Sequence, residues 1–199
     1  GMRVSTVCQV NQGNLVITRS TDSPSGNVAL DSTNVTLAKF DVKAVGEAIR
    51  VSTLTVDATD TSGTTDWTNI TNLRIFYDGI QVGTTQNTAA KDTDYPITLS
   101  FTAPVGVTKT LEIKGDIKSA AGAADAITAN DKIAARFLVG TSNAQRLTSL
   151  GTFNFPAAIS GGNALTVVTA AISAAKNQSV GNVSVVNNQQ NVTIRSYLI

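Results

Sequence analysis

Residues 110–117 read TLEIKGDI, and the alternation in this stretch decides the fold class. Leu111, Ile113 and Ile117 lie on one side of an extended chain, whereas the charged residues between them, Asp116 included, are expected to face water. Gly115 interrupts the apolar row, which indicates a bend or the close approach of another segment. The stretch therefore predicts a β-strand with one buried face.

The same alternation recurs along the whole chain. The Asp78-Gly79 pair separates two alternating runs and is typical of a type I′ hairpin turn. The Ala-rich residues 118–131 are expected to form a loop with at most one helical turn. Because no long amphipathic helix pattern is present, we predict an all-β fold, an antiparallel Ig-like β-sandwich. The predicted strands are 14–18, 34–44, 48–57, 70–77, 80–84, 96–102, 108–117, 132–139, 164–169, 182–186 and 191–198.

Two of these strands change their inward face part of the way along. In residues 34–44, Val35 and Leu37 share one face, whereas Ala38 and Phe40 share the other. One extra residue near positions 37–38 would restore a single buried face, and this is what a β-bulge does. Residues 49–56 change face in the same way, so we expect an irregularity in each strand.

The end of the chain repeats its beginning. Residues 13–40 read GNLVITRSTDSPSGNVALDSTNVTLAKF, and residues 162–197 read GNALTVVTAAISAAKNQSVGNVSVVNNQQNVTIRSY. Gly13 matches Gly162 at an offset of 149 residues (162 − 13), and Asn34 matches Asn191 at an offset of 157 (191 − 34). The offset grows only in polar stretches, where insertions cost little. The pattern predicts a tandem repeat of roughly 150 residues.

This repeat predicts the domain organisation. We expect residues 13–160 to form one complete sandwich and residues 161–199 to be a partial second repeat. Residues 1–12 are then the terminal strand of a preceding repeat, or a linker. Half a sandwich leaves a sheet edge uncovered. Residues 161–199 are therefore expected to pack on the first domain, to pair with another chain by strand exchange or in a homo-oligomer, or to be partly disordered.

Composition excludes several classes of function. The 199 residues include no histidine and one cysteine, which removes His-dependent catalysis, His-ligated zinc and internal disulfides. The net charge is +1 without a Lys/Arg cluster, so we expect no nucleic-acid partner. No apolar run reaches the ~18–20 residues of a membrane span. Only 15% of the residues are charged, which with the many Thr, Ser and Asn is typical of extracellular β-proteins.

Three stretches carry a resemblance to a known kind of protein. They are residues 34–40 (NVTLAKF), 70–79 (ITNLRIFYDG) and 108–117 (TKTLEIKGDI). With them the chain resembles the tandem β-sandwich repeats of large secreted or cell-surface proteins from uncultured, candidate-phylum-like bacteria. The resemblance covers most of residues 13–140. It implies a stalk, surface-layer or adhesin module, and it carries over no catalytic residues.

Five carboxylates are the candidate metal ligands. Calcium takes about six to eight oxygen ligands, and inter-strand loops of surface sandwiches often supply them. Neither of the two stretches involved has EF-hand spacing, and a lysine precedes the second. The alternative is turn chemistry, in which Asp bonds its own backbone. We assign no cofactor, and calcium is the one candidate. The residues are Asp57, Asp60, Asp66, Asp92 and Asp94.

Trp67 and Tyr95 are the candidate ligand-binding residues, because aromatic rings can serve as platforms for sugars. The alternative for Trp67 is packing at the core or its rim, beside Ile70 and Leu73. No arrangement of residues typical of an active site is present, so we predict a protein that is not an enzyme.

Taken together, the sequence predicts a non-catalytic structural or spacer module at the cell surface or outside the cell. Its expected partners are neighbouring repeats of the same polypeptide, and its export signal and anchor are expected outside this segment. The alternative function is a carbohydrate- or host-surface-binding module that uses inter-strand loops such as 57–69 and 85–95, with or without calcium.

Overall fold

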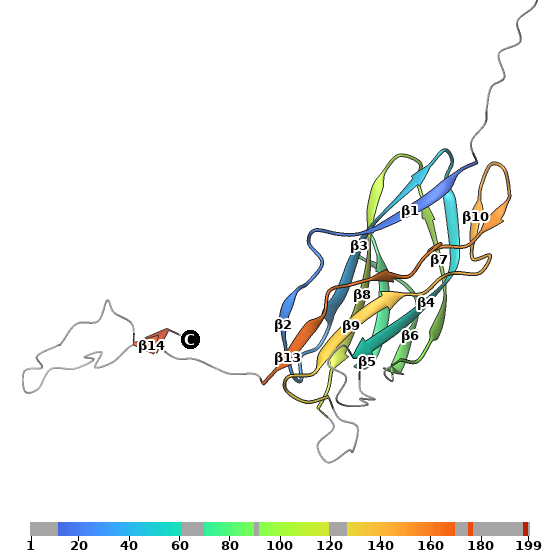
Figure 1. Cartoon of the computed structure of the whole chain (residues 1–199). Coiled ribbons are helices and arrows are strands. Elements are labelled where there is room, and N and C mark those ends of the chain that lie inside the picture. The colour runs from blue at the N-terminus through green and yellow to red at the C-terminus, as the bar shows by residue number, and fades with distance from the viewer. Residues whose placement is uncertain are drawn as a thin grey trace, which may run out of the picture. The chain divides into compact units, whose positions relative to one another are not determined.

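The computed structural model describes residues 12–60, 70–89, 92–119 and 127–169, together with 175–176 and 197–198. The chain divides into two compact units, residues 1–169 and 170–199. In the described part of the first unit, the regular elements are all β-strands, arranged in two facing sheets (Figure 1). The prediction of an all-β, sandwich-like fold is therefore confirmed for these residues.

The first sheet has five strands, and every neighbouring pair in it is antiparallel. Their order across the sheet is β1-β3-β8-β5-β6, so β8 lies at the centre. The strands are β1 (Asn14–Arg19), β3 (Val35–Val45), β5 (Ile70–Tyr77), β6 (Ile80–Ala89) and β8 (Thr108–Ile117).

The second sheet has eight strands, several of them short. Its main path is β11-β10-β4-β9-β13-β2, with β7 paired to β4 and β12 paired to β9. The β2–β13 pair is parallel, whereas the other pairs of this sheet are antiparallel. The strands are β2 (Gly26–Ala29), β4 (Ile49–Asp60), β7 (Tyr95–Ala103), β9 (Lys132–Phe137), β10 (Ala144–Arg146), β11 (Thr152–Phe153), β12 (Ser160–Gly161) and β13 (Leu165–Val168).

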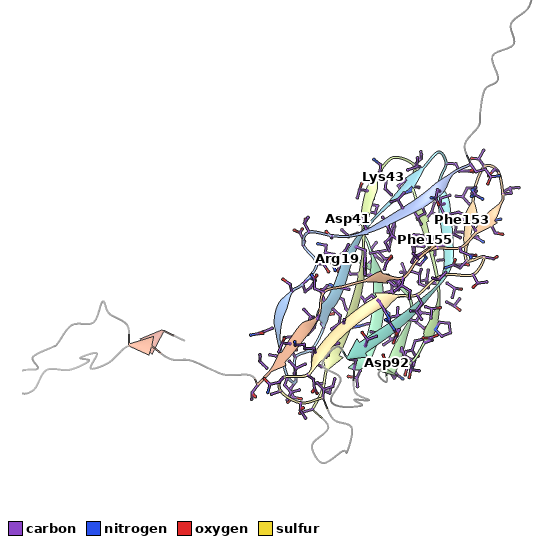
Figure 2. All side chains as sticks on the ribbon, viewed as in Figure 1. Arg19, Asp41, Lys43, Asp92, Phe153 and Phe155 are labelled. Atoms are coloured by element: carbon purple, nitrogen blue, oxygen red, sulfur yellow. The ribbon has the colours of Figure 1, made fainter. Side chains whose placement is uncertain are left out.

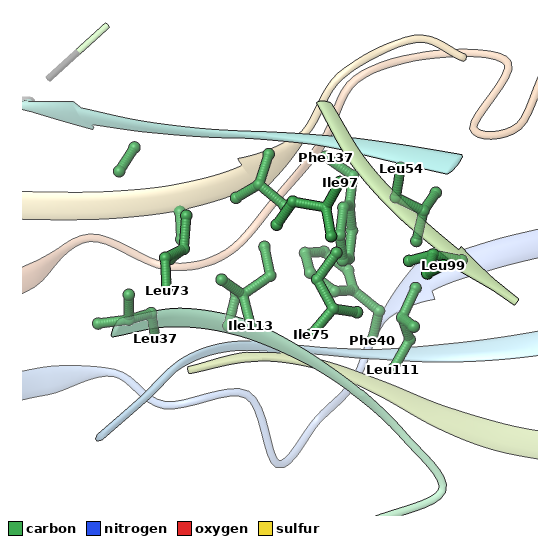
Figure 3. Close-up of a cluster of buried hydrophobic side chains, with 14 of the residues drawn as sticks. Leu37, Phe40, Leu54, Leu73, Ile75, Ile97, Leu99, Leu111, Ile113 and Phe137 are labelled. Carbon is green, nitrogen blue, oxygen red and sulfur yellow. The ribbon is translucent and has the colours of Figure 1, made fainter. Parts of the chain in front are cut away.

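One apolar core fills the space between the sheets (Figure 3). Phe40 of the first sheet meets Phe137 of the second, with ring centroids 5.3 Å apart, and both are fully buried. Leu111, Ile113 and Ile117 lie in this core as the alternation predicts. A core that draws alternate residues from two facing sheets is what holds a β-sandwich together.

Close packing between strands explains why residue 115, within the stretch 110–117, is a glycine. A Cβ atom at position 115 would lie 2.7 Å from Ile70 Cγ2, so only glycine leaves room for the neighbouring strand. The predicted close approach is confirmed. The expectation that Asp116 faces water is wrong, because this residue is only 7% exposed. Donors from distant parts of the chain cover its carboxylate.

Both predicted irregularities are present. The register of β3 against β8 shifts between Thr36 and Ala38, and that of β4 against β7 shifts between Val51 and Thr53. The extra residue in each strand turns the following apolar residues back toward the core. The Asp78-Gly79 turn joins β5 and β6 as predicted, with positive φ at both residues.

The polypeptide enters the first unit at one end and leaves it at the opposite end (Figure 1). Residues 12–13 lead into β1 beside the β3–β4, β7–β8 and β10–β11 turns, and we call this the entry end. β13 begins level with the far end of β4, because Leu165 pairs with Ile133 and Ile133 pairs with Asp60. β13 then runs farther away, to the exit end at Thr169.

The predicted boundary at residue 160 falls inside the first unit, before β13. Leu165 and Val167 are buried in its core, and β13 pairs with both β9 and β2. In the second unit, β14 (Ala175–Lys176) pairs antiparallel with β15 (Tyr197–Leu198). The predicted strand 182–186 and the predicted element 1–12, apart from residue 12, lie outside the described residues.

Candidate functional site

Asp57 is the predicted site residue with the most distinctive surroundings. It lies on β4 opposite Arg136 of β9 and is 1% exposed. Arg136 Nε donates a hydrogen bond of 2.8 Å to Asp57 Oδ2, and a second guanidinium nitrogen contacts the same oxygen. Asp57 Oδ1 is buried and has no hydrogen-bond partner among the described residues. One oxygen of the carboxylate is thus bound to arginine, and the other is uncommitted.

The pKa of Asp57 is raised above its usual value. Burial is the main cause and the carboxylates of Asp92 and Asp94 add to it, whereas the hydrogen bond and charge of Arg136 act in the opposite direction. Asp92 N–H donates to Ala58 O at 2.9 Å, which holds the 92–94 turn beside the far end of β4. Figure 2 shows Asp92 near the exit end. The fold therefore brings three of the five candidate carboxylates within electrostatic range.

These carboxylates do not form a metal centre by themselves. Within the described ranges, no group of three or more His, Cys, Asp or Glu side chains is placed to hold a metal ion. Arg136 also puts a positive charge against Asp57, which opposes a cation there. The side chain of Asp60 and all of Asp66 lie outside the described residues, so the calcium site stays a prediction.

Of the two aromatic candidates, one lies within the described residues and one does not. Trp67 lies outside the described residues. Tyr95 begins β7, is half-buried and packs against the core. Tyr77 stacks on Phe101 with centroids 4.2 Å apart and lies near Thr102 O, and burial is the main cause that raises its pKa to about 12. Tyr95 and Tyr77 thus contribute to packing, and no aromatic platform is formed by the two.

A polar clamp that sequence reasoning missed surrounds Asp116. Asn34 N–H and Asn72 Nδ2 each donate to this carboxylate at 2.7 Å, and Arg74 lies 3.6 Å away. The net effect of its surroundings is to lower the pKa of Asp116 below the usual value. Burial acts to raise this pKa, but the hydrogen bonds from Asn34 and Asn72 and the charges of Arg74 and Lys118 outweigh burial. Both asparagines have positive φ, a conformation that Asn tolerates better than most residues. The clamp ties β3, β5 and β8 together.

A shallow depression opens beside β10. Asn143 is one of its lining residues; its Nδ2 donates to Thr53 O at 2.6 Å, and its Oδ1 accepts the Phe155 N–H at 2.8 Å. The amide is therefore used to hold the backbone and offers little to a ligand. The depression is lined by Arg50, Ser52, Ser142, Asn143, Ala144, Gln145 and Thr152.

The described residues thus contain structural polar clusters and one partly uncommitted carboxylate. Nowhere in the described ranges is there a helix long and apolar enough to cross a membrane. No protein-family model matches the chain, and no curated protein matches its sequence.

Proposed function

We propose that this chain is a non-catalytic spacer from a repetitive cell-surface or secreted protein, in which Ig-like sandwiches follow one another in tandem. The observation that carries the proposal is the register of the β14–β15 pair. Adding 157 to the numbers of the paired residues Arg19 and Phe40 gives Lys176 and Tyr197, which are paired in the second unit. The adjacent pair of each ladder corresponds in the same way.

A constant offset of 157 residues replaces the offset of 149 to 157 predicted from Gly13 and Asn34, and several other residues correspond at this constant offset. The Asn-Val-Thr motif at 34–36 recurs at 191–193, and Val28 corresponds to Val185. Upstream, Cys8 and Val10 correspond to the buried residues Leu165 and Val167 of β13. One period of 157 residues then runs from 12 to 168, which makes β13 the last strand of one sandwich and β14 part of the first strand of the next.

The path of the chain suits a spacer that bears tension. Force at the entry end acts first on β1, which is paired with β3, and reaches β2 through β1, whereas force at the exit end pulls directly on β13. Because β2 and β13 are parallel neighbours, the hydrogen bonds between them are loaded together in shear. Bonds that must break together resist more force than bonds that open one at a time. The β2–β13 pair is therefore expected to contribute to mechanical resistance together with the β1–β3 pair.

Single-molecule force spectroscopy tests this function. The sample is the full chain with one period duplicated, so that residues 1–168 are followed by residues 12–199. Each sandwich that unfolds should release about 50 nm of chain, because an extended residue spans ~3.3–3.6 Å. Two such events per molecule are expected. A duplicated period that gives no additional event contradicts the tandem proposal.

A matched pair of proline variants tests the role of β2. Leu30 N–H donates to Val168 O at 2.8 Å, so Leu30→Pro removes one of the loaded bonds. Backbone donors alternate in direction along a strand, so the N–H of Asn27 points away from β13. We expect a lower unfolding force for Leu30→Pro and little change for Asn27→Pro. Equal forces for the two variants would show that the β2–β13 pair does not bear the load.

A further inference from the structure

The entry end of the first unit carries an apolar surface. Polar residues are usual at the tips of turns, because turn backbones need water or local side-chain partners. Here five large aliphatic side chains are between 42% and 66% exposed. We call them the entry patch, and they are Val45, Val105, Val107, Leu147 and Leu150. Ile80, which is 71% exposed, follows the β5–β6 turn at the same end.

Hydrogen bonds join the turns that present the entry patch. Gly106 N–H donates to Ala44 O at 2.8 Å, which connects the β7–β8 turn to the end of β3. Leu147 N–H donates to Ala48 O at 3.0 Å, which connects the β10–β11 loop to the β3–β4 turn. The five residues of the patch are therefore carried by the β3–β4 segment itself and by turns that are hydrogen-bonded to it.

Glu47 fixes the incoming chain to this surface. Its carboxylate accepts hydrogen bonds from Thr148 N–H at 2.7 Å and Ser149 N–H at 2.8 Å. Bonds from Ser149, and smaller contributions from Thr148 and Gly13, lower the pKa of Glu47. Arg146 Nε donates to Gly13 O. The residue that precedes β1 is thus held against the loop that carries two patch residues.

The described residues of the exit end carry no side chain of the kind that forms the entry patch. Among the described residues, the large aliphatic side chains with high exposure are the entry patch, Ile80, Val16, Val139 and Ile159. Val16 lies on β1 near the entry end, Val139 follows β9 and Ile159 precedes β12, so none of the nine is at the exit end. Among the described residues, large exposed aliphatic side chains thus gather at the entry end, and such a grouping indicates an interaction site there.

We propose that the entry patch is the contact surface for the preceding repeat of the same polypeptide, an inference that rests on the proposed tandem function. The offset of 157 residues indicates which part of the polypeptide would contact the entry patch. Asn14, the first residue of β1, corresponds to Ala171, and β13 ends at Val168. In the proposed array, two residues therefore separate the last strand of a preceding repeat from β1, at the entry end.

Because successive repeats are covalently connected, a small apolar surface is enough to hold them in contact. A short linker raises the effective concentration of two neighbouring domains to about the millimolar range. Contacts too weak to hold separate molecules together then hold adjacent repeats in one orientation. The interface would convert a flexible string of sandwiches into a stiff array.

Distance measurements between spin labels test the interface. The full chain carrying the duplicated period (1–168 followed by 12–199) receives Cys8→Ser and, in both copies, Ser100→Cys on an exposed position of β7. The patch variant adds Val105→Ser and Leu150→Ser in the second copy. The control variant instead adds Val139→Ser and Ile159→Ser there, which are similarly exposed but lie away from the entry end.

The parent and the control should each give one narrow distance peak, and the patch variant should lose it. A broad distribution in the parent, or a narrow peak that survives in the patch variant, overturns the interface. Force spectroscopy on the same chains separates this from failure of the spacer function. Two unfolding events with a broad distribution refute only the interface, whereas a missing second event refutes the tandem function. Patch-dependent dimers of the 199-residue chain would also overturn the assignment to the preceding repeat.

Discussion

Replacing Asp116 by Asn should cost more stability than any surface charge change in this chain. The carboxylate is 7% exposed and accepts two bonds of 2.7 Å, from Asn34 N–H and Asn72 Nδ2. An amide at position 116 keeps one acceptor oxygen and turns an N–H group toward the other donor. Because hydrogen bonds to a charged group contribute about 1.5–3 kcal/mol, we expect a loss of about 2–3 kcal/mol at pH 7.

Urea denaturation of the full chain, followed by near-UV circular dichroism, measures this loss. The control is Asp22→Asn, in which the replaced side chain is 79% exposed and 4.0 Å from Lys39. This control should change stability by less than about 0.5 kcal/mol.

The pKa of Asp116 is lowered in the folded state, so the stabilisation by Asp116 is full above the unfolded pKa of about 4 and is lost as the pH falls through the folded pKa. The difference between wild type and Asp116→Asn should therefore shrink below about pH 4. A loss no larger than that of Asp22→Asn, or one that is the same at about pH 2.5, would refute this reasoning.

Three other substitutions have defined outcomes. Gly83 has φ +77° and a Cβ there would lie 2.6 Å from Thr98 O, whereas Gly79 has φ +80° in open space. Thermal unfolding should show a larger loss for Gly83→Ala than for Gly79→Ala, and equal losses would exclude the steric contribution. Phe40→Ala should cost about 3–5 kcal/mol in urea, because the ring is fully buried; a cost below about 1 kcal/mol would mean that the core collapses into the space. Glu47→Gln should speed hydrogen exchange in residues 147–150 with the core unchanged, and unaltered exchange there would argue against the carboxylate as the anchor.

The long strands were predictable because each has one face in a single core. Alternation located β5 and β8 to the residue, and the change of face near residues 37–38 located the β3 irregularity. Strands β10, β11 and β12 were not predictable, because two or three residues are too few to show a period of two. Their pairing is set by the longer strands beside them.

The polar clusters around Asp116 and Asp57 could not be predicted from the sequence, because their members come together only in the folded chain. Alternation wrongly predicted that Asp116 faces water, because alternation carries no information on which residues cover that side of the strand. The donors come from Asn34 and Asn72, which are 82 and 44 residues away in sequence. Asp57 was chosen as a loop carboxylate, yet its partner Arg136 is 79 residues away on a neighbouring strand. Interactions between residues so far apart leave no local pattern in the sequence.

The parallel pair of β2 with β13 also fixes when a repeat can finish folding. β2 is made early, but its partner begins 139 residues later (165 − 26). Contacts of such high sequence separation slow folding and leave strand edges open in the meantime. In the proposed array, the strand that closes one sandwich resembles the strand that closes its neighbour, so a growing chain offers each open edge a competing strand. Differences between such strands, such as Cys8 where the later copy has Leu165, reduce that competition. Sequence divergence between adjacent repeats is then a safeguard for correct assembly during synthesis.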